Sequence, residues 1–168
     1  MSQLKTKVEG WLKDMGLTPI PQADPKAEWH FLVHYPANGP TSVDVLSPKG
    51  QPGKIMIICG VELSHDHREA FDKLDDDGKN DFLWRFRHTI NVPESDFALD
   101  GADGVLDCPS RFQIASARYE DGLTLDSFAS SVGAVFKTHL RAIWVIQEHL
   151  SPRNFGTGGR FDFKRLGL

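Results

Sequence analysis

The strongest structural signal in this sequence is an apolar stripe that runs through residues 124–150. Apolar side chains recur there at spacings of three and four residues, which places them within about 140° of one another on a helix. They are Leu125, Phe128, Ala129, Val132, Val135, Phe136, Leu140, Ile143, Ile146 and Leu150. The pattern predicts one long helix that packs a single face against a core, with Phe136 near the centre of that face.

A second amphipathic helix is predicted at the start of the chain, over residues 3–15. Ser2 can cap its first turn, and Gly16 can end it because glycine adopts the left-handed backbone that follows many helices. Residues 18–25 contain three prolines and are therefore predicted to form a loop.

Three strands are predicted next. Residues 29–35 and 42–45 alternate apolar side chains with others, which is typical of half-buried strands. Residues 54–61 form a continuous apolar run, and this run predicts a central strand that is covered on both faces.

The second half of the chain begins with two short helices, at residues 65–74 and 79–91. Three aspartates and a glycine at 75–78 are predicted to break the helix between them. Strands are then predicted at residues 96–100 and 111–120, before the long helix.

The order of elements is thus α-β-β-β-α-β-β-α, which predicts an α+β fold. We expect an antiparallel sheet of about five strands with helices packed mainly on one side. Residues 1–150 are predicted to form a single domain. Residues 151–168 contain four glycines and four basic residues but lack periodicity, and they are predicted to form a flexible basic tail.

This order of elements resembles the type III secretion chaperone-like fold and uncharacterised prokaryotic families that share it. The resemblance covers residues 1–150 and implies a sheet with its helices on one side. It also implies a protein that dimerises or binds peptide segments of partner proteins.

The composition of the chain limits the classes of function that we expect for this protein. The net charge of −4 and the pI of about 5.9 argue against a nucleic-acid-binding or membrane-surface protein. No apolar run approaches the roughly 20 residues of a membrane helix, and residues 1–8 do not resemble a signal peptide. We therefore expect a cytoplasmic protein. Cys59 lies in an apolar run and is predicted to be a buried thiol rather than one half of a disulfide with Cys108.

A candidate partner-binding surface lies on the helix predicted at residues 79–91. The predicted core face of this helix consists of Phe82, Leu83, Phe86 and Ile90. Trp84 lies on the opposite side, with Arg87 and His88 beside it. Tryptophan and arginine are enriched in binding hot spots, so these three residues predict a site for a protein partner or a second copy of the chain. The competing interpretation is that a loop or the tail covers Trp84.

The alternative functional hypothesis is a metal-dependent enzyme that uses Glu62, His65 and His67, since carboxylates and imidazoles are common ligands of zinc. If Ser64 caps a helix, however, His65 and His67 point about 200° apart on that helix. His30 and His34 share one face of a strand but lie too far apart for one ion, so they are interpreted as polar residues on a solvated face.

No other motif predicts catalysis or nucleotide binding. The glycines at 156–159 lack the lysine and hydroxyl residue of a phosphate-binding loop, and no frame for a nucleophile surrounds Cys108. The leading prediction is therefore a non-enzymatic protein-binding or chaperone-like module that needs no cofactor. A third hypothesis is an accessory domain whose basic tail binds an acidic partner.

Overall fold

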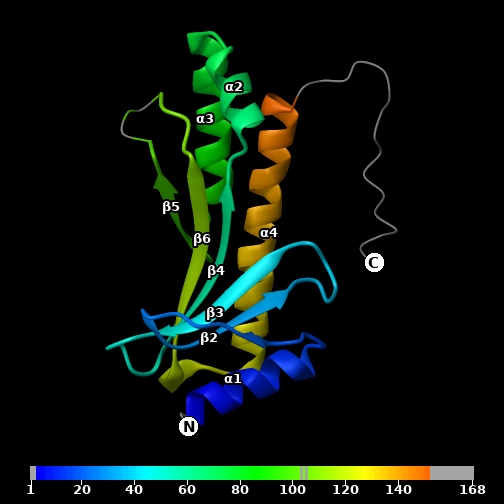
Figure 1. The fold of residues 1–168 in the computed structure, drawn as a ribbon, viewed down its shortest axis with the longest axis vertical. Helices are drawn as coiled ribbons and strands as arrows, with labels where there is room; N and C mark the ends of the chain where they lie inside the picture. Colours follow the sequence, from blue (N-terminus) through cyan, green and yellow to red (C-terminus); the bar gives the residue numbers. More distant parts are fainter. Residues whose placement is uncertain (1–2, 103, 105, 152–168) are drawn as a thin grey trace.

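The computed structural model describes residues 3–102, 104 and 106–151. They form an α+β structure in which a six-stranded antiparallel sheet carries its helices on one face (Figure 1). The predicted fold class is therefore confirmed, with one strand more than expected. The tail predicted over residues 151–168 lies outside the described residues from residue 152 on, as does the cap predicted at Ser2.

The helices and strands follow the predicted order closely. The helices are α1 (Gln3–Asp14), α2 (His65–Asp72), α3 (Asp76–Ile90) and α4 (Leu125–Leu150), with a short 3-10 helix at Glu120–Gly122. The strands are β1 (Ile20–Pro21), β2 (Ala27–His34), β3 (Ser42–Pro48), β4 (Lys54–Glu62), β5 (Asp96–Asp100) and β6 (Arg111–Tyr119). The sheet order is β1-β2-β3-β4-β6-β5, so β6 pairs with both β4 and β5 while β5 forms one edge. No described helix combines the length and the apolar character that crossing a membrane requires.

The additional strand, β1, lies in the segment that was predicted to be a loop. Ile20 pairs with Leu32 and Pro21 with Phe31, and the amide of Gln22 donates to the carbonyl of His30 at 2.9 Å. The prolines predicted a loop because proline has no amide proton to donate to the hydrogen bonds between strands. At the edge of a sheet this restriction is tolerated, since one side of the strand needs no partner.

Helix α3 begins three residues earlier than predicted. The carboxylate of Asp75 accepts a hydrogen bond from the amide of Gly78 at 2.8 Å and so caps the helix. Asp76 and Asp77 then occupy the first turn, where negative charge is favourable beside the free amides. The acidic segment therefore starts a helix rather than only separating two.

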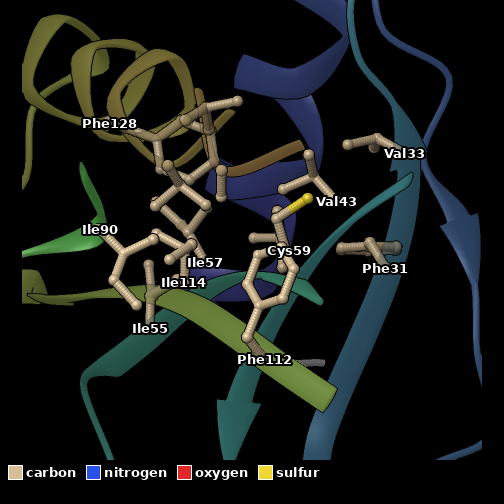
Figure 2. Packing of buried hydrophobic residues seen from close by; sticks show 14 of the residues in the cluster. Phe31, Val33, Val43, Ile55, Ile57, Cys59, Ile90, Phe112, Ile114 and Phe128 are labelled. Carbon is tan, nitrogen blue, oxygen red and sulfur yellow. The ribbon is translucent and has the colours of Figure 1, made fainter. Parts of the chain in front are cut away.

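The core lies between the helices and one face of the sheet. Strands β2, β3, β4 and β6 bury every second side chain on that face. Figure 2 shows this packing, in which side chains from neighbouring strands lie in one cluster with Ile90 of α3 and Phe128 of α4. The strand residues labelled there are Phe31, Val33, Val43, Ile55, Ile57, Cys59, Phe112 and Ile114.

The expectation that β4 is covered on both faces is wrong. Ile55, Ile57 and Cys59 are buried beneath the helices, whereas Met56 and Ile58 on the other face are only half-buried. That second face carries no helix within the described part of the chain. Among the described residues, neighbouring strands and the loop before β2 border this face, so a continuous apolar run did not require two layers of helix.

The buried face of α4 differs from the predicted stripe. Ser131, Thr138 and His139 are buried, whereas Phe136 is only half-buried and packs edge-on against Tyr35 with ring centroids 4.9 Å apart. Phe136 is therefore not at the centre of the core face. Helix α4 contacts β4 and β6 on one side and α3 on another, so polar side chains are buried where these elements approach closely.

Replacing Phe128 by alanine should destabilise the protein more than the same change at Phe136. Phe128 is fully buried and contacts Trp11, so Phe128→Ala should lower the free energy of unfolding by about 3–5 kcal/mol. Phe136→Ala should lower it by about 1–2 kcal/mol, because that ring is already partly exposed. Urea unfolding monitored by circular dichroism measures the stability of both variants. An equal or larger loss of stability in Phe136→Ala would contradict the observed buried face of α4.

His139 is a titratable group within this core. Its side chain is buried, its ring packs 6.1 Å from the ring of Phe112, and its Nδ1 has no hydrogen-bond partner among the described residues. Burial lowers the pKa of His139 below the ordinary value of 6.5.

His139 should make the protein less stable in mild acid. The unfolded chain takes up a proton at this residue below about pH 6.5 while the folded chain does not, so stability should fall from that pH towards the lower folded pKa. A His139→Leu variant should lose this part of the pH dependence. Thermal unfolding of both proteins between pH 5 and 8 measures the difference, and an unchanged pH profile in the variant would contradict it.

Candidate protein-binding surface

The sequence of α3 separates two faces. Phe82, Leu83, Phe86 and Ile90 are buried on the face that packs against α4 and the sheet. The rings of Phe82 and Phe86 stack 5.7 Å apart, and Phe86 lies edge-on to Phe112 at 5.2 Å. This packing fixes the rotation of α3 and places the next residues of the helical repeat outside.

The outer face of α3 carries Trp84, Arg87 and His88, which we call the α3 surface. Trp84 is 66% exposed, and its ring lies 5.2 Å from that of His88 with only 4° between the planes. The two residues are one helical turn apart, so the helix itself brings the rings together. The stacked pair forms a flat aromatic face on the outside of the protein.

The two arginines of α3 differ in their partners. Arg85 donates to Asp81 at 3.1 Å, and this hydrogen bond lowers the pKa of Asp81. His149 of α4 lies 3.4 Å from the same carboxylate and adds a smaller effect, which links α3 to α4. Arg87 is half-buried and has no ion pair or side-chain hydrogen bond among the described residues, so its guanidinium is available to a ligand.

Five residues separate the end of α3 from the start of strand β5. A bridge between Val92 and Ser95 closes the turn between them. On one side β5 pairs with β6, and its other side has no strand partner within the described residues. Phe97 is 39% exposed on this strand. In the chain, α3 is therefore followed by a strand at the edge of the sheet (Figure 1).

The structure does not bring Glu62, His65 and His67 together. Ser64 caps α2 by accepting from the amide of His67 at 3.3 Å, so the two histidines diverge on a helix. His65 is solvent-exposed and lies 3.2 Å from Glu69, while the ring of His67 contacts Ser64 at 3.0 Å. No group of three potential metal ligands occurs among the residues that the structure describes.

Both cysteines are free thiols, as predicted for Cys59. Cys59 is buried and donates to the carbonyl of Ser42 at 3.3 Å. Burial raises the pKa of Cys59 to about 12, with a smaller contribution from Asp44. Burial also raises the pKa of Cys108 to about 11, and the nearby charge of Asp72 adds to this while Arg68 opposes it. Neither thiol is arranged as a nucleophile.

One cluster was not predicted as a unit. Asp24, His30 and Asp44 lie together on the face of the sheet that no helix of the described residues covers, with Nε2 of His30 2.8 Å from the carboxylate of Asp44. The sequence placed His30 on a solvated face, but its side chain is only 14% exposed. The sequence placed His30 and Asp44 on adjacent strands, which could have indicated a contact between them. Predicting that contact requires the register of the two strands, which the sequence did not specify.

Comparison with known proteins identifies the family. A family model described as an uncharacterised conserved protein, DUF2299, matches residues 4–146. The chain belongs to DUF2299. A crystal structure of an uncharacterised protein from Methanothermobacter thermautotrophicus is similar to this DUF2299 member, with a TM-score of 0.76 and 27% sequence identity. The similarity covers 87% of this chain and 98% of that one. No curated protein matches the sequence.

The two thiols should be unreactive in the folded protein. With pKa values of about 12 and 11, Cys59 and Cys108 hold little thiolate at pH 8. Modification by Ellman's reagent at pH 8 should therefore be at least about 100-fold slower than that of a free thiol, because the thiolate fraction is lower by more than that factor at both residues. Addition of denaturant should restore the ordinary rate, and rapid labelling of native Cys108 would contradict the raised pKa.

Proposed function

We propose that this protein is a non-enzymatic protein-binding module that docks a second copy of itself or a segment of another protein on the α3 surface. The observation that carries this proposal is the 66% exposure of Trp84, stacked on His88. Tryptophan supplies a large, rigid contact area at a low cost in conformational entropy, and arginine presents several hydrogen-bond donors in one plane; both residue types are enriched in binding hot spots. Arg87 adds a guanidinium that no described residue occupies.

The architecture is consistent with a chaperone-like role. The antiparallel sheet, the helices on one face and the α2–α3 insertion between β4 and β5 agree with the resemblance to the type III secretion chaperone-like fold. Strand β5, which follows α3 in the chain, has no strand partner on its outer edge within the described residues, and such edges can accept an extended segment. The fold alone does not determine function, so the proposal depends on the surface.

Trp84 should contribute more binding energy than any other residue of this surface. A Trp84→Ala variant should fold normally, because the side chain is outside the core, and should weaken association by about 2 kcal/mol, or roughly 30-fold. Light scattering after size exclusion, across a range of concentrations, measures self-association. Tyr119→Ala is the matched control, since Tyr119 is a 59% exposed aromatic on β6.

The oligomeric state distinguishes self-association from the binding of another protein. A concentration-dependent dimer that Trp84→Ala weakens and Tyr119→Ala does not would support self-association. A monomer at every concentration would leave a segment of another protein as the ligand. Retention of all self-association and partner contacts by a folded Trp84→Ala variant would exclude the α3 surface.

A further inference from the structure

A polar pocket lies on the face of the sheet that no described helix covers. Its volume is about 430 Å³, which is in the range of small-molecule sites. Strands β2, β3, β4 and β6 and the loop before β2 contribute to it, and Leu46 and Ile58 supply apolar surface. None of its residues belongs to the α3 surface, so this pocket is independent of the proposed protein-binding site.

The acidic side of the pocket is held in place by His30. Its Nε2 lies 2.8 Å from Oδ1 of Asp44, and its Nδ1 lies 3.5 Å from Oδ2 of Asp24, outside hydrogen-bond geometry. The other oxygen of Asp24 accepts from the amide of Lys26 at 2.8 Å. Both ring nitrogens of His30 therefore face carboxylates, although only Nε2 is in hydrogen-bond contact with one. The cluster places two carboxylates on one side of the pocket.

The opposite side of the pocket carries an unpaired cation. Arg111 is exposed, and one guanidinium nitrogen lies 3.8 Å from the point where a Cβ on Gly60 would be. Within the described residues its side chain has no ion pair or hydrogen bond, and neither does the amide of Gln113 beside it. An arginine with a neighbouring amide is suited to a carboxylate, which accepts two parallel hydrogen bonds.

Gly60 keeps this side of the pocket open. It lies within β4, where glycine is unfavourable, and its φ is outside the left-handed region that would require glycine. A Cβ at this position would contact Gln113 Cγ at 3.4 Å and approach Arg111. Glycine within a strand often marks the close approach of a ligand, and here the missing side chain leaves room above the strand.

The two charged sides lie within the span of one small molecule. Asp44 pairs with Ile58, and Gly60 lies two residues further along β4. Such diagonal neighbours have Cα atoms about 7–8 Å apart. The second carboxylate oxygen of Asp44 makes no hydrogen bond within the described residues, so it can accept from a ligand while Arg111 donates to the other end.

We propose that this pocket binds a small zwitterion of the amino-acid type. The carboxylate of the ligand contacts the guanidinium of Arg111 and the amide of Gln113, while its ammonium contacts Asp44. The body of the ligand lies against Leu46 and Ile58. A ligand that carries both charges can contact Arg111 and the second oxygen of Asp44 at once, whereas a simple anion or a simple cation can contact only one of them.

The test uses the full chain and the twenty standard L-amino acids as probes. At least one should raise the melting temperature and bind saturably in isothermal titration calorimetry, since a ligand that binds only the folded state stabilises it. Propionate and propylamine each carry one of the two charges, and each should bind at least about tenfold more weakly than the best amino acid.

Three variants locate the binding site. Each variant should weaken amino-acid binding at least about tenfold. Arg111→Gln removes the cation, Asp44→Asn removes the anion, and Gly60→Val fills the pocket. Gly60→Val removes no hydrogen bond and adds a strand-favouring residue, so it keeps the test valid if Asp44→Asn fails to fold. Arg141→Gln is the matched control, because Arg141 is an exposed arginine on α4 outside this pocket and should bind as the unmodified chain does.

Three results would overturn the proposal. The first is that no amino acid at about 10 mM shifts the melting temperature or gives a heat of binding, since a weaker interaction is not a site. The second is that Arg111→Gln and Gly60→Val bind as tightly as the unmodified chain. The third is that propionate binds as tightly as the best amino acid, because the pocket would then be a general anion site.

Discussion

The burial of one face of the antiparallel sheet beneath helices is the constraint on which the rest of this structure depends. Alternating side chains along β2, β3, β4 and β6 create an apolar layer that must be removed from water. Helices α3 and α4 cover much of it, with Phe86 edge-on to Phe112 across the boundary between helix and sheet. The capping residues Thr124 and Asp75 fix where α4 and α3 begin, so the apolar faces of both helices meet the sheet in register.

Covering one face of the sheet leaves two other surfaces for function. The outer side of α3 carries the stacked rings of Trp84 and His88, because the inner side of that helix is occupied by phenylalanines. The second face of the sheet carries His30 between two aspartates and Arg111 near a glycine. The first surface is flat and aromatic, which suits a protein, whereas the second is concave and charged, which suits a small polar molecule.

The sequence predicted these features to different degrees. Helical periodicity alone placed Trp84 opposite four apolar side chains, but it left open whether another segment covers this residue, and only the structure shows Trp84 to be 66% exposed. The face of α4 was less well predicted, because Ser131, Thr138 and His139 are buried only through contacts with α3 and the sheet. The cluster of Asp24, His30 and Asp44 could not be predicted, because its three members come together through the β2–β3 register and a proline-rich loop.

The sequence by itself determined the order and the type of nearly every helix and strand, and the pairing of apolar faces that makes an α+β fold. Periodicity and capping are local properties, so they can be recognised without knowing the partners of each segment. The tertiary structure decided the strand order, the extra edge strand, the rotation of α4 and the uncovered face of the sheet. These depend on which segments pack together, and contacts between residues distant in the chain leave no local pattern in the sequence.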